Sequence, residues 1–280
     1  MFTIEKRETV HREQDFLQDE FPSATIGRIS LQRAGMTFQA GLCICRCRFA
    51  SSHAVRAVLS KGELKHLDRL VFEQRRRSYA MGRYAAKKAL SVLSDENPED
   101  IHIEHGIFNN PIMRGVGQEI FDVSITHSSE FAAALVFPAS HPMGIDIEPV
   151  DLTKTSVIES ELTANELNLL RNFAHPAGYA ERVTAAWTIK ESLSKVLRTG
   201  LTVPFFIYEL ATMDESDSGY VSTFKHFGQY KGLTFVLGDH VCSITCPRKT
   251  ECQLDVTSIR DRLAQERMFP GISTVRGNCY

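Results

Sequence analysis

Acidic residues that could act on a phosphate group stand out in the segment Asp146-Ile147-Glu148. Residues two apart on a strand share one face, so a strand here would aim both carboxylates in the same direction. Paired carboxylate oxygens suit Mg²⁺, which takes one or two carboxylates and completes its octahedral shell with water and phosphate oxygens. Taken alone, the pair also fits an exposed strand edge with two solvated acids.

A second charged segment lies on a predicted helix that contains Glu191 and Lys195. At about 100° per residue the apolar residues fall on one face, and Trp187, Glu191, Lys195 and Arg198 form a stripe nearly opposite. A stripe of plain charges would be a solvated face with one Glu–Lys pair. Because the only tryptophan of the chain lies in the stripe, we expect this face to contact another part of the protein, such as a lobe interface.

The third feature is Ser124-Ile125-Thr126-His127-Ser128-Ser129, which is typical of a strand that runs into a tight turn. A histidine in a turn can present a ring nitrogen to a phosphate, and nearby hydroxyls such as that of Ser128 and free turn amides add donors. A lone turn histidine is otherwise an ordinary surface residue. The combination of all three features favours phosphate chemistry more than any one of them.

Hydrophobic periodicity predicts the elements that position these residues. Long helices are expected over 64–93 and 180–197, with a shorter one over 162–173. Strands are expected over 37–49, 101–103, 122–126, 131–137, 144–148, 206–211, 233–237 and 241–246.

The second half of the chain repeats the order of the first. Residues 83–90 align with 190–197, and the hairpin that ends at Pro138 aligns with the one that ends at Pro247, at offsets of about 107 to 109 positions. An ancient duplication would leave this pattern, although chance similarity between two α+β stretches could also produce it. We expect an extension over 1–35, a first α+β lobe over 36–148, a second over 149–250 and a tail over 251–280, with a ligand cleft between the lobes.

Composition narrows the function classes. The chain has 280 residues and a formal net charge of −2, which does not favour a nucleic-acid binder, although Arg75 begins a local basic run. Seven cysteines, an odd number, argue for reduced thiols. Cys43, Cys45 and Cys47 alternate as on a buried strand face, unlike the spacing of a zinc knuckle. No signal-peptide or membrane-spanning pattern is visible, so we expect a cytoplasmic protein that does not bind a membrane.

The two charged segments together resemble a known family. Gly144-Ile145-Asp146-Ile147-Glu148, followed by Trp187-Thr188-Ile189-Lys190-Glu191-Ser192-Leu193-Ser194-Lys195, is similar to the paired signature of the surfactin-synthetase-type 4'-phosphopantetheinyl transferases, in the same order and spacing. Residues 124–128 resemble the strand-turn histidine motif of the family. Residues 75–90, which contain Gly82-Arg83, resemble a helix of its enterobactin-type branch. The similarity covers residues 64–205 and weakens towards Pro247.

This resemblance implies an α+β fold of two similar lobes related by pseudo-twofold symmetry, with coenzyme A bound between them as co-substrate. It implies a monomeric holo-[acyl-carrier-protein] synthase that moves 4'-phosphopantetheine onto a serine of an acyl or peptidyl carrier protein in fatty acid, polyketide or nonribosomal peptide biosynthesis. By the same resemblance, Asp146, Glu148 and Glu191 hold Mg²⁺. The residues implied to contact coenzyme A are Arg75, Arg83, His127, Ser128, Lys190 and Lys195.

The implied chemistry is an in-line attack of the serine hydroxyl on the pantetheine-side phosphorus, with 3',5'-adenosine bisphosphate leaving. Lys195 would neutralise charge on the leaving oxygen, and either Glu191 or a metal-bound water would accept the serine proton. Two positions depart from the family pattern: Thr126 stands where serine is frequent, and Asn110 precedes Pro111 where many relatives have lysine. A non-catalytic module that binds carrier proteins or coenzyme A, and a magnesium-dependent phosphohydrolase, are the alternatives.

Overall fold

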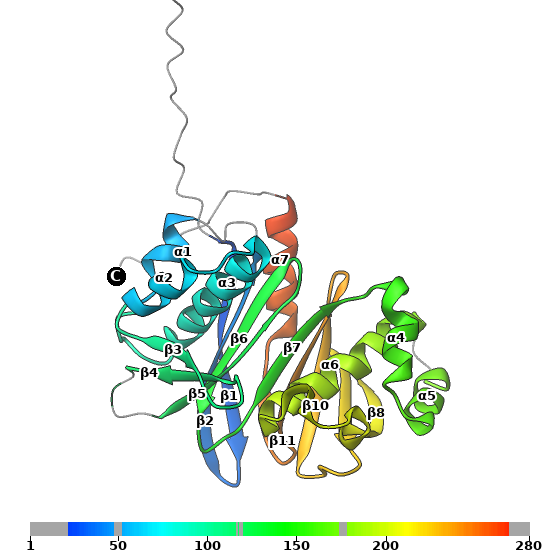
Figure 1. Cartoon of the computed structure of the whole chain (residues 1–280). Coiled ribbons are helices and arrows are strands. Elements are labelled where there is room, and N and C mark those ends of the chain that lie inside the picture. The colour runs from blue at the N-terminus through cyan, green and yellow to red at the C-terminus, as the bar shows by residue number, and fades with distance from the viewer. Residues whose placement is uncertain (1–21, 48–51, 116, 118–119, 174–177, 269–280) are drawn as a thin grey trace, which may run out of the picture.

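A computed structural model describes residues 22–47, 52–115, 117, 120–173 and 178–268. These residues form two five-stranded antiparallel sheets, each covered by helices on one face (Figure 1). The predicted α+β class is therefore confirmed. None of the helices in this part of the chain is long and apolar enough to span a membrane.

The first lobe is built on one of the two five-stranded sheets. Its strands, in spatial order, are β12 (Glu251–Gln253), β1 (Ala24–Arg33), β2 (Met36–Arg46), β6 (Phe131–Pro138) and β5 (Phe121–His127). A two-stranded ribbon of β3 (His102–His105) and β4 (Pro111–Arg114) lies beside it. Its helices are α1 (His53–Ala57), α2 (Lys61–Leu67) and α3 (Glu73–Leu90).

The single helix predicted over 64–93 is wrong, because the structure divides it into α2 and α3. Phe72, which precedes α3, has extended backbone angles. Arg76 stabilises the break: its Nη1 donates to the carbonyl oxygens of Leu67 and Leu70 at 3.1 and 3.2 Å. Helix-ending carbonyl groups need such partners, and the arginine supplies them from the next helix.

The second lobe has the same plan. Its sheet runs β7 (Gly144–Pro149), β11 (His240–Pro247), β10 (Tyr230–Leu237), β9 (Gly219–Phe224) and β8 (Leu210–Ser216). Its helices are α4 (Thr155–Ser160), α5 (Ala164–Arg171) and α6 (Tyr179–Leu197), with 3₁₀ turns at Leu152–Lys154, Gly200–Thr202 and Phe205–Tyr208. The strand predicted over 206–211 begins only at Leu210, because the aromatic segment before it forms the last of these turns.

Strand alternation divides the core into layers. On β6, Phe131, Ala133 and Leu135 face a core between the two sheets, whereas Ala132 and Ala134 face the core under α3. Both faces of this strand are buried, which explains its unbroken apolar sequence. Cys43, Cys45 and Cys47 are buried in the core under α3 with free thiols, as their alternating spacing predicts.

The described parts of both terminal segments belong to the fold. β1 pairs along its length with β2, and β12 adds to the free edge of β1. The last helix, α7 (Val256–Met268), packs Val256, Ile259 and Leu263 into the core between the sheets. The predicted extension over 1–35 and tail over 251–280 are therefore corrected: within these two segments, residues 22–35 and 251–268 are described as part of the fold, and 1–21 and 269–280 lie outside the described residues.

The internal repeat is present, but the predicted alignment of the long helices is displaced by one turn. A Cβ at Gly41 would clash with the Ala89 carbonyl oxygen of α3, and a Cβ at Gly144 would clash with the Ser192 carbonyl oxygen of α6. Both helices thus approach a glycine on the neighbouring strand at the same place. Lys87, not Arg83, is the counterpart of Lys190, because each forms the same buried ion pair in its lobe.

Candidate active site

The predicted acidic strand is β7, at the edge of the second sheet that faces the first lobe. Ile145 and Ile147 point into the core between the sheets. Asp146 and Glu148 alternate with them and therefore lie on the other face of the strand, beneath α6. Asp146 is only 4% exposed, so the alternative of two solvated edge acids does not hold for it.

Asp146 is held from both lobes. Its Oδ1 accepts hydrogen bonds from the Thr126 hydroxyl on β5 and from the Lys195 ammonium on α6, both at 2.8 Å. Lys195 also donates to the Ile145 carbonyl oxygen at 2.9 Å. On the same face of β5 as Thr126, the Ser124 hydroxyl accepts a hydrogen bond from the Ile145 amide of β7 at 3.1 Å. Side-chain hydroxyls of β5 therefore connect the facing edges of the two sheets.

Two carboxylate oxygens of this site are buried and have no partner, namely Oδ2 of Asp146 and Oε1 of Glu191. We call Asp146, Glu148 and Glu191 the acidic cluster. Desolvation, followed by repulsion from Asp146, raises the pKa of Glu191. The same two causes, with Glu191 adding to them, raise the pKa of Glu148 to about 7. Repulsion between neighbouring carboxylates thus disfavours the charged forms of Glu148 and Glu191.

This donor set fits a hard divalent cation. Buried carboxylate oxygens without partners are a costly arrangement that a bound cation would relieve, and oxygen ligands are those that Mg²⁺ prefers. Among the described residues, no three histidine, cysteine or acidic side chains already stand in the geometry of a metal-binding group. In this structure the Lys195 ammonium is the cation next to Asp146.

The strand-turn motif lies where β5 ends. The His127 side chain is exposed, and partial desolvation together with the nearby Lys195 ammonium lowers its pKa. The imidazole therefore lies within the electrostatic reach of the acidic cluster. Ser128 closes the turn, since its hydroxyl accepts from the Phe131 amide at 3.1 Å.

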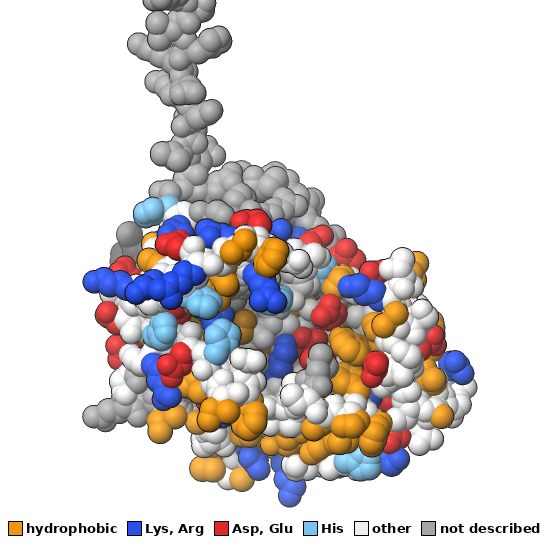
Figure 2. All heavy atoms as spheres, in the orientation of Figure 1, with side chains coloured by type: hydrophobic (Ala, Val, Ile, Leu, Met, Phe, Trp, Pro, Cys, Tyr) orange, Lys and Arg blue, Asp and Glu red, His pale blue; other side chains and the backbone are white. Residues whose placement is uncertain are grey.

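Arg83 approaches from α3 in the first lobe. It is 7% exposed, its guanidinium lies 3.8 Å from the centre of the Tyr79 ring, and its Nη2 is 3.2 Å from Nε2 of His105. Its Nε is buried without a partner. Arg75 is exposed on the first turns of the same helix, and no contact among the described residues joins it to Arg83 or to the acidic cluster. Basic, acidic and histidine side chains gather on the face shown in Figure 2.

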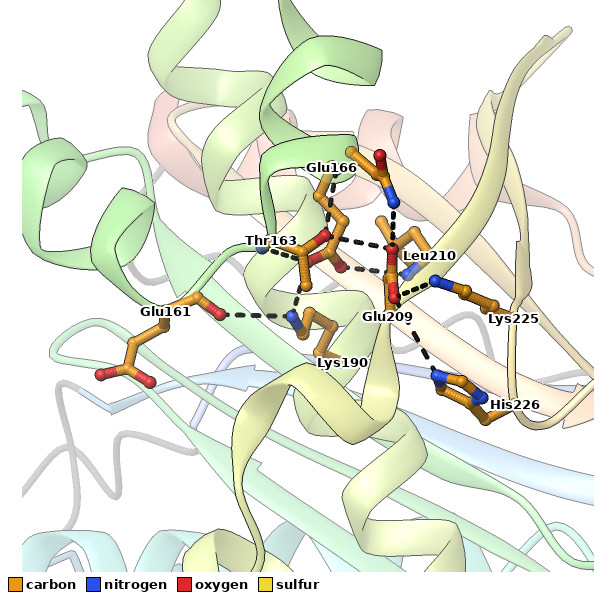
Figure 3. A network of polar contacts seen from close by, with 9 residues as sticks. Glu161, Thr163, Glu166, Lys190, Glu209, Leu210, Lys225 and His226 are labelled. Atoms are coloured by element: carbon orange, nitrogen blue, oxygen red, sulfur yellow. Dashed lines mark hydrogen bonds and ion pairs between the residues drawn. The ribbon is translucent and has the colours of Figure 1, made fainter.

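Lys190 does not reach this site. Its ammonium is fully buried on another face of α6, where it donates to Glu166 at 2.9 Å and to the Glu161 carbonyl oxygen (Figure 3). Glu166 in turn accepts from the amides of Thr163 and Leu210 at 2.8 and 3.0 Å. The contact with coenzyme A predicted for Lys190 is therefore corrected to a structural role: it joins the start of α5 to the start of β8.

The first lobe carries no equivalent of the acidic cluster. With Gly41 matched to Gly144 and Ala89 to Ser192, the positions of Asp146, Glu148 and Glu191 are taken by Cys43, Cys45 and Lys88. The buried cysteine face of β2 is thus the counterpart of the acidic face of β7. Although both lobes share one plan, the acids belong to one of them.

Sequence reasoning missed three residues of the site. Thr126 was noted only for departing from the family pattern, Tyr79 was not considered, and His105 was not considered either. A signal existed for Thr126: Ser124 and Thr126 alternate on one face of the strand predicted over 122–126. A signal also existed for Tyr79, which precedes Arg83 by four residues on the same helix. No comparable pattern points to His105, because it meets Arg83 from a separate element, β3.

Comparison with known proteins identifies part of the chain. Residues 142–245, which span β7 to β11 and hold the whole acidic cluster and Lys195, match the family model described as "ACPS: 4'-phosphopantetheinyl transferase superfamily". This segment is therefore similar to the 4'-phosphopantetheinyl transferase superfamily. Arg83 and His127 lie before it.

A comparison with solved structures also gives a match to part of the chain. The chain is similar to a holo-(acyl-carrier-protein) synthase from Bacillus anthracis str. Ames, solved in complex with CoA (3',5'-ADP). The two are 23% identical with a TM-score of 0.32, over 40% of this chain and 96% of that one. No curated protein gives a significant match.

Proposed function

We propose that this protein transfers 4'-phosphopantetheine from coenzyme A to a serine of a carrier protein, as a phosphopantetheinyl transferase of the surfactin-synthetase type. One observation carries the proposal. Within the segment that matches the transferase family, Asp146, Glu191 and Lys195 converge around two buried carboxylate oxygens that have no partner. Such oxygens are suited to a cation that accompanies a diphosphate.

Lys195 is our candidate for stabilising the leaving group. An ammonium has three N–H donors, and two of them are used on Asp146 and on the Ile145 carbonyl oxygen. The third remains for a phosphate oxygen of coenzyme A. Because these two bonds fix the ammonium before substrate arrives, it can neutralise the charge that develops on the departing 3',5'-adenosine bisphosphate without first being reoriented.

Glu191 is our candidate for accepting the proton of the carrier serine. Desolvation and Asp146 raise its pKa, which brings the carboxylate closer to the basicity that proton transfer at neutral pH requires. Asp146, Glu148 and Glu191 would hold Mg²⁺, which supplies charge neutralisation and alignment of the diphosphate when bound. A carboxylate that shares its lone pairs with a cation is a weaker base, so a metal-bound water positioned by Glu191 is the second candidate.

His127 and Arg83 are proposed to hold the 3'-phosphate and adenine end of coenzyme A. The His127 imidazole and the Arg83 guanidinium both carry N–H donors. The Nε of Arg83 has no partner, which leaves one donor for a phosphate oxygen. Arg75 and Ser128 remain weaker candidates for the same role. The pairing of two lobes within one chain supports a monomer. The carrier pathway stays as the resemblance implies it, and the cytoplasmic location stays a prediction from the sequence pattern.

The test is transfer with purified protein, coenzyme A, Mg²⁺ and an apo-carrier. We expect the carrier to gain the mass of one phosphopantetheine arm, and a carrier with its serine changed to alanine to gain nothing. Chelation of Mg²⁺ should abolish the reaction. Cleavage of coenzyme A that proceeds equally well without carrier would instead identify a magnesium-dependent phosphohydrolase. Binding of carrier with neither reaction would identify a non-catalytic module.

A further inference from the structure

A hollow lined by none of the acidic-cluster residues lies where the two lobes and the C-terminal helix meet. The cavity has a volume of about 370 Å³. β2 ends at it, β6 begins at it, and the β10–β11 hairpin and α7 close its other sides. Its lining includes Arg46, Phe131, Val236, Leu237, Leu263 and Ala264.

Arg46 is the unusual member of this lining. It is 6% exposed, its Nη1 donates to Glu130 at 3.1 Å, and its guanidinium lies 4.7 Å from the centre of the Phe131 ring. Its Nε is buried without a partner. Its Nη2 donates no hydrogen bond to any of the described residues. The Nε–Nη2 edge, which can bind a carboxylate through two parallel hydrogen bonds, therefore has no partner among them. A buried donor without a partner is costly.

The rest of the lining is apolar or already engaged. Arg260 also lines the cavity, but its Nε donates to the Val236 carbonyl oxygen and its Nη2 to that of Ser218, both at 2.9 Å. These bonds hold β10 and the turn between β8 and β9 against α7. One open guanidinium edge beside aliphatic walls selects a ligand with a single carboxylate and an apolar body. The volume is at the small end of the range for ligand sites, so the body must be short.

We propose that this cavity binds a small amphipathic carboxylate, of the class of short- and medium-chain fatty acids. The carboxylate takes the Nε–Nη2 edge of Arg46, and the alkyl chain lies along Leu237 and Leu263. None of these residues belongs to the acidic cluster or to the residues proposed to contact coenzyme A. The inference is thus independent of the proposed transferase activity.

The test is a calorimetric titration of the full-length protein with octanoate. Octanol, which lacks the charge, and inorganic phosphate, which lacks the alkyl chain, are the matched probes. We expect saturable binding of octanoate and at least about tenfold weaker binding of octanol and of phosphate. Octanol loses the two charge-assisted hydrogen bonds, and phosphate loses the apolar contact. The ¹⁵N-labelled Arg46 side chain should report the same event as a shift of its Nε–H resonance.

Two variants locate the site. Arg46→Lys keeps the charge but removes the two-donor edge, so octanoate binding should weaken about ten- to a hundredfold. Ala264 is exposed on α7 and lines the cavity, so the ring of Ala264→Phe should fill the cavity and weaken octanoate binding. Gln265 is an exposed neighbour that does not line the cavity, so the Gln265→Phe variant should bind octanoate as the parent does. Because both phenylalanines are placed at exposed positions, this pair remains informative if Arg46→Lys fails to fold.

Any of three results would overturn the proposal. The first is that octanoate shows no saturable binding below about 10 mM. The second is that Ala264→Phe and Gln265→Phe bind octanoate equally well. The third is that inorganic phosphate displaces octanoate, which would identify a site for simple anions instead.

Discussion

Replacing Lys190 with methionine separates a structural lysine from one that binds coenzyme A. Lys190 and Glu166 are both fully buried, with their charged atoms 2.9 Å apart. Methionine fills a similar volume and leaves the Glu166 carboxylate without its cation, although the amides of Thr163 and Leu210 still donate to it. Breaking a buried ion pair by removing one partner costs about 3–5 kcal/mol, and we expect the lower end because these two donors remain.

The expected loss is readily measured. A chain of this size loses about 2–4 °C of melting temperature per kcal/mol, so Lys190→Met should melt roughly 10 °C below the parent. The Michaelis constant for coenzyme A should not change at temperatures where the variant is folded, because the Lys190 ammonium bonds Glu166 (Figure 3), whereas it is Lys195 that bonds Asp146 of the acidic cluster. Calorimetry and steady-state transfer kinetics measure the two quantities.

The first lobe offers a matched control for this experiment. Lys87 forms the corresponding buried pair with Glu63, and Glu63 accepts from the amide of Ile103 much as Glu166 accepts from that of Leu210. Lys87→Met should therefore destabilise the protein by a similar amount. If Lys190→Met melts like the parent and raises the Michaelis constant for coenzyme A, the structural assignment is refuted.

Three further predictions concern single side chains. Thr126→Val should lower kcat/KM for transfer by about ten- to a hundredfold, because it removes a hydrogen bond to the charged Asp146, while Thr126→Ser should stay near the parent. His127→Ala should weaken binding of coenzyme A more than that of 3'-dephospho-coenzyme A; equal losses in calorimetry would mean that it does not hold the 3'-phosphate. His141, whose Nε2 lies 2.8 Å from the Thr250 hydroxyl, has its pKa lowered by burial. As the pH falls, the His141 imidazole therefore binds a proton in the unfolded protein at a higher pH than in the folded protein. The stability that this histidine contributes above about pH 6.5 is then lost as the pH falls further. Denaturation of His141→Gln should show a smaller loss between pH 6.5 and 5, and an unchanged loss would contradict this assignment.

The sequence predicted the acidic strand well because its signal is local. Alternation of Ile145, Asp146, Ile147 and Glu148 determines which side chains face the core and which face α6, and this alternation is fixed once a strand forms. The match of residues 142–245 to the transferase family covers the same strand and the helix above it. Local periodicity and a paired motif therefore located the centre of the site.

The register of the repeat could not be read from the same signals. Both long helices are rich in alanine, lysine and leucine, so an alignment displaced by one helical turn preserves the apolar face. The correct alignment lies in polar residues: Ser60 and Glu63 form a capping box before α3, and Thr163 and Glu166 form one before α6. Matching these pairs would have identified Lys190 as a buried partner of Glu166.

Long-range contacts account for the remaining differences. β1 and β12 are separated by most of the chain yet pair within one sheet, and neither the ten residues of β1 nor the three of β12 carry a sign of that partner. The contact between Arg83, Tyr79 and His105 likewise depends on how the β3–β4 ribbon packs beside α3. Such arrangements are determined by tertiary packing and not by local propensity.

The most direct test of the central claim is transfer by Asp146→Asn. Asparagine keeps the shape of the side chain and an oxygen that can accept from Thr126, but removes the negative charge from the centre of the acidic cluster. Asp122→Asn, which breaks only a partly exposed pair with Arg198, is the matched control. We predict that Asp146→Asn stays folded by circular dichroism, loses at least about a hundredfold in phosphopantetheine transfer, and binds Mn²⁺ more weakly, whereas Asp122→Asn does none of these. Transfer by folded Asp146→Asn within about tenfold of the parent, with unchanged Mn²⁺ binding, would contradict the account.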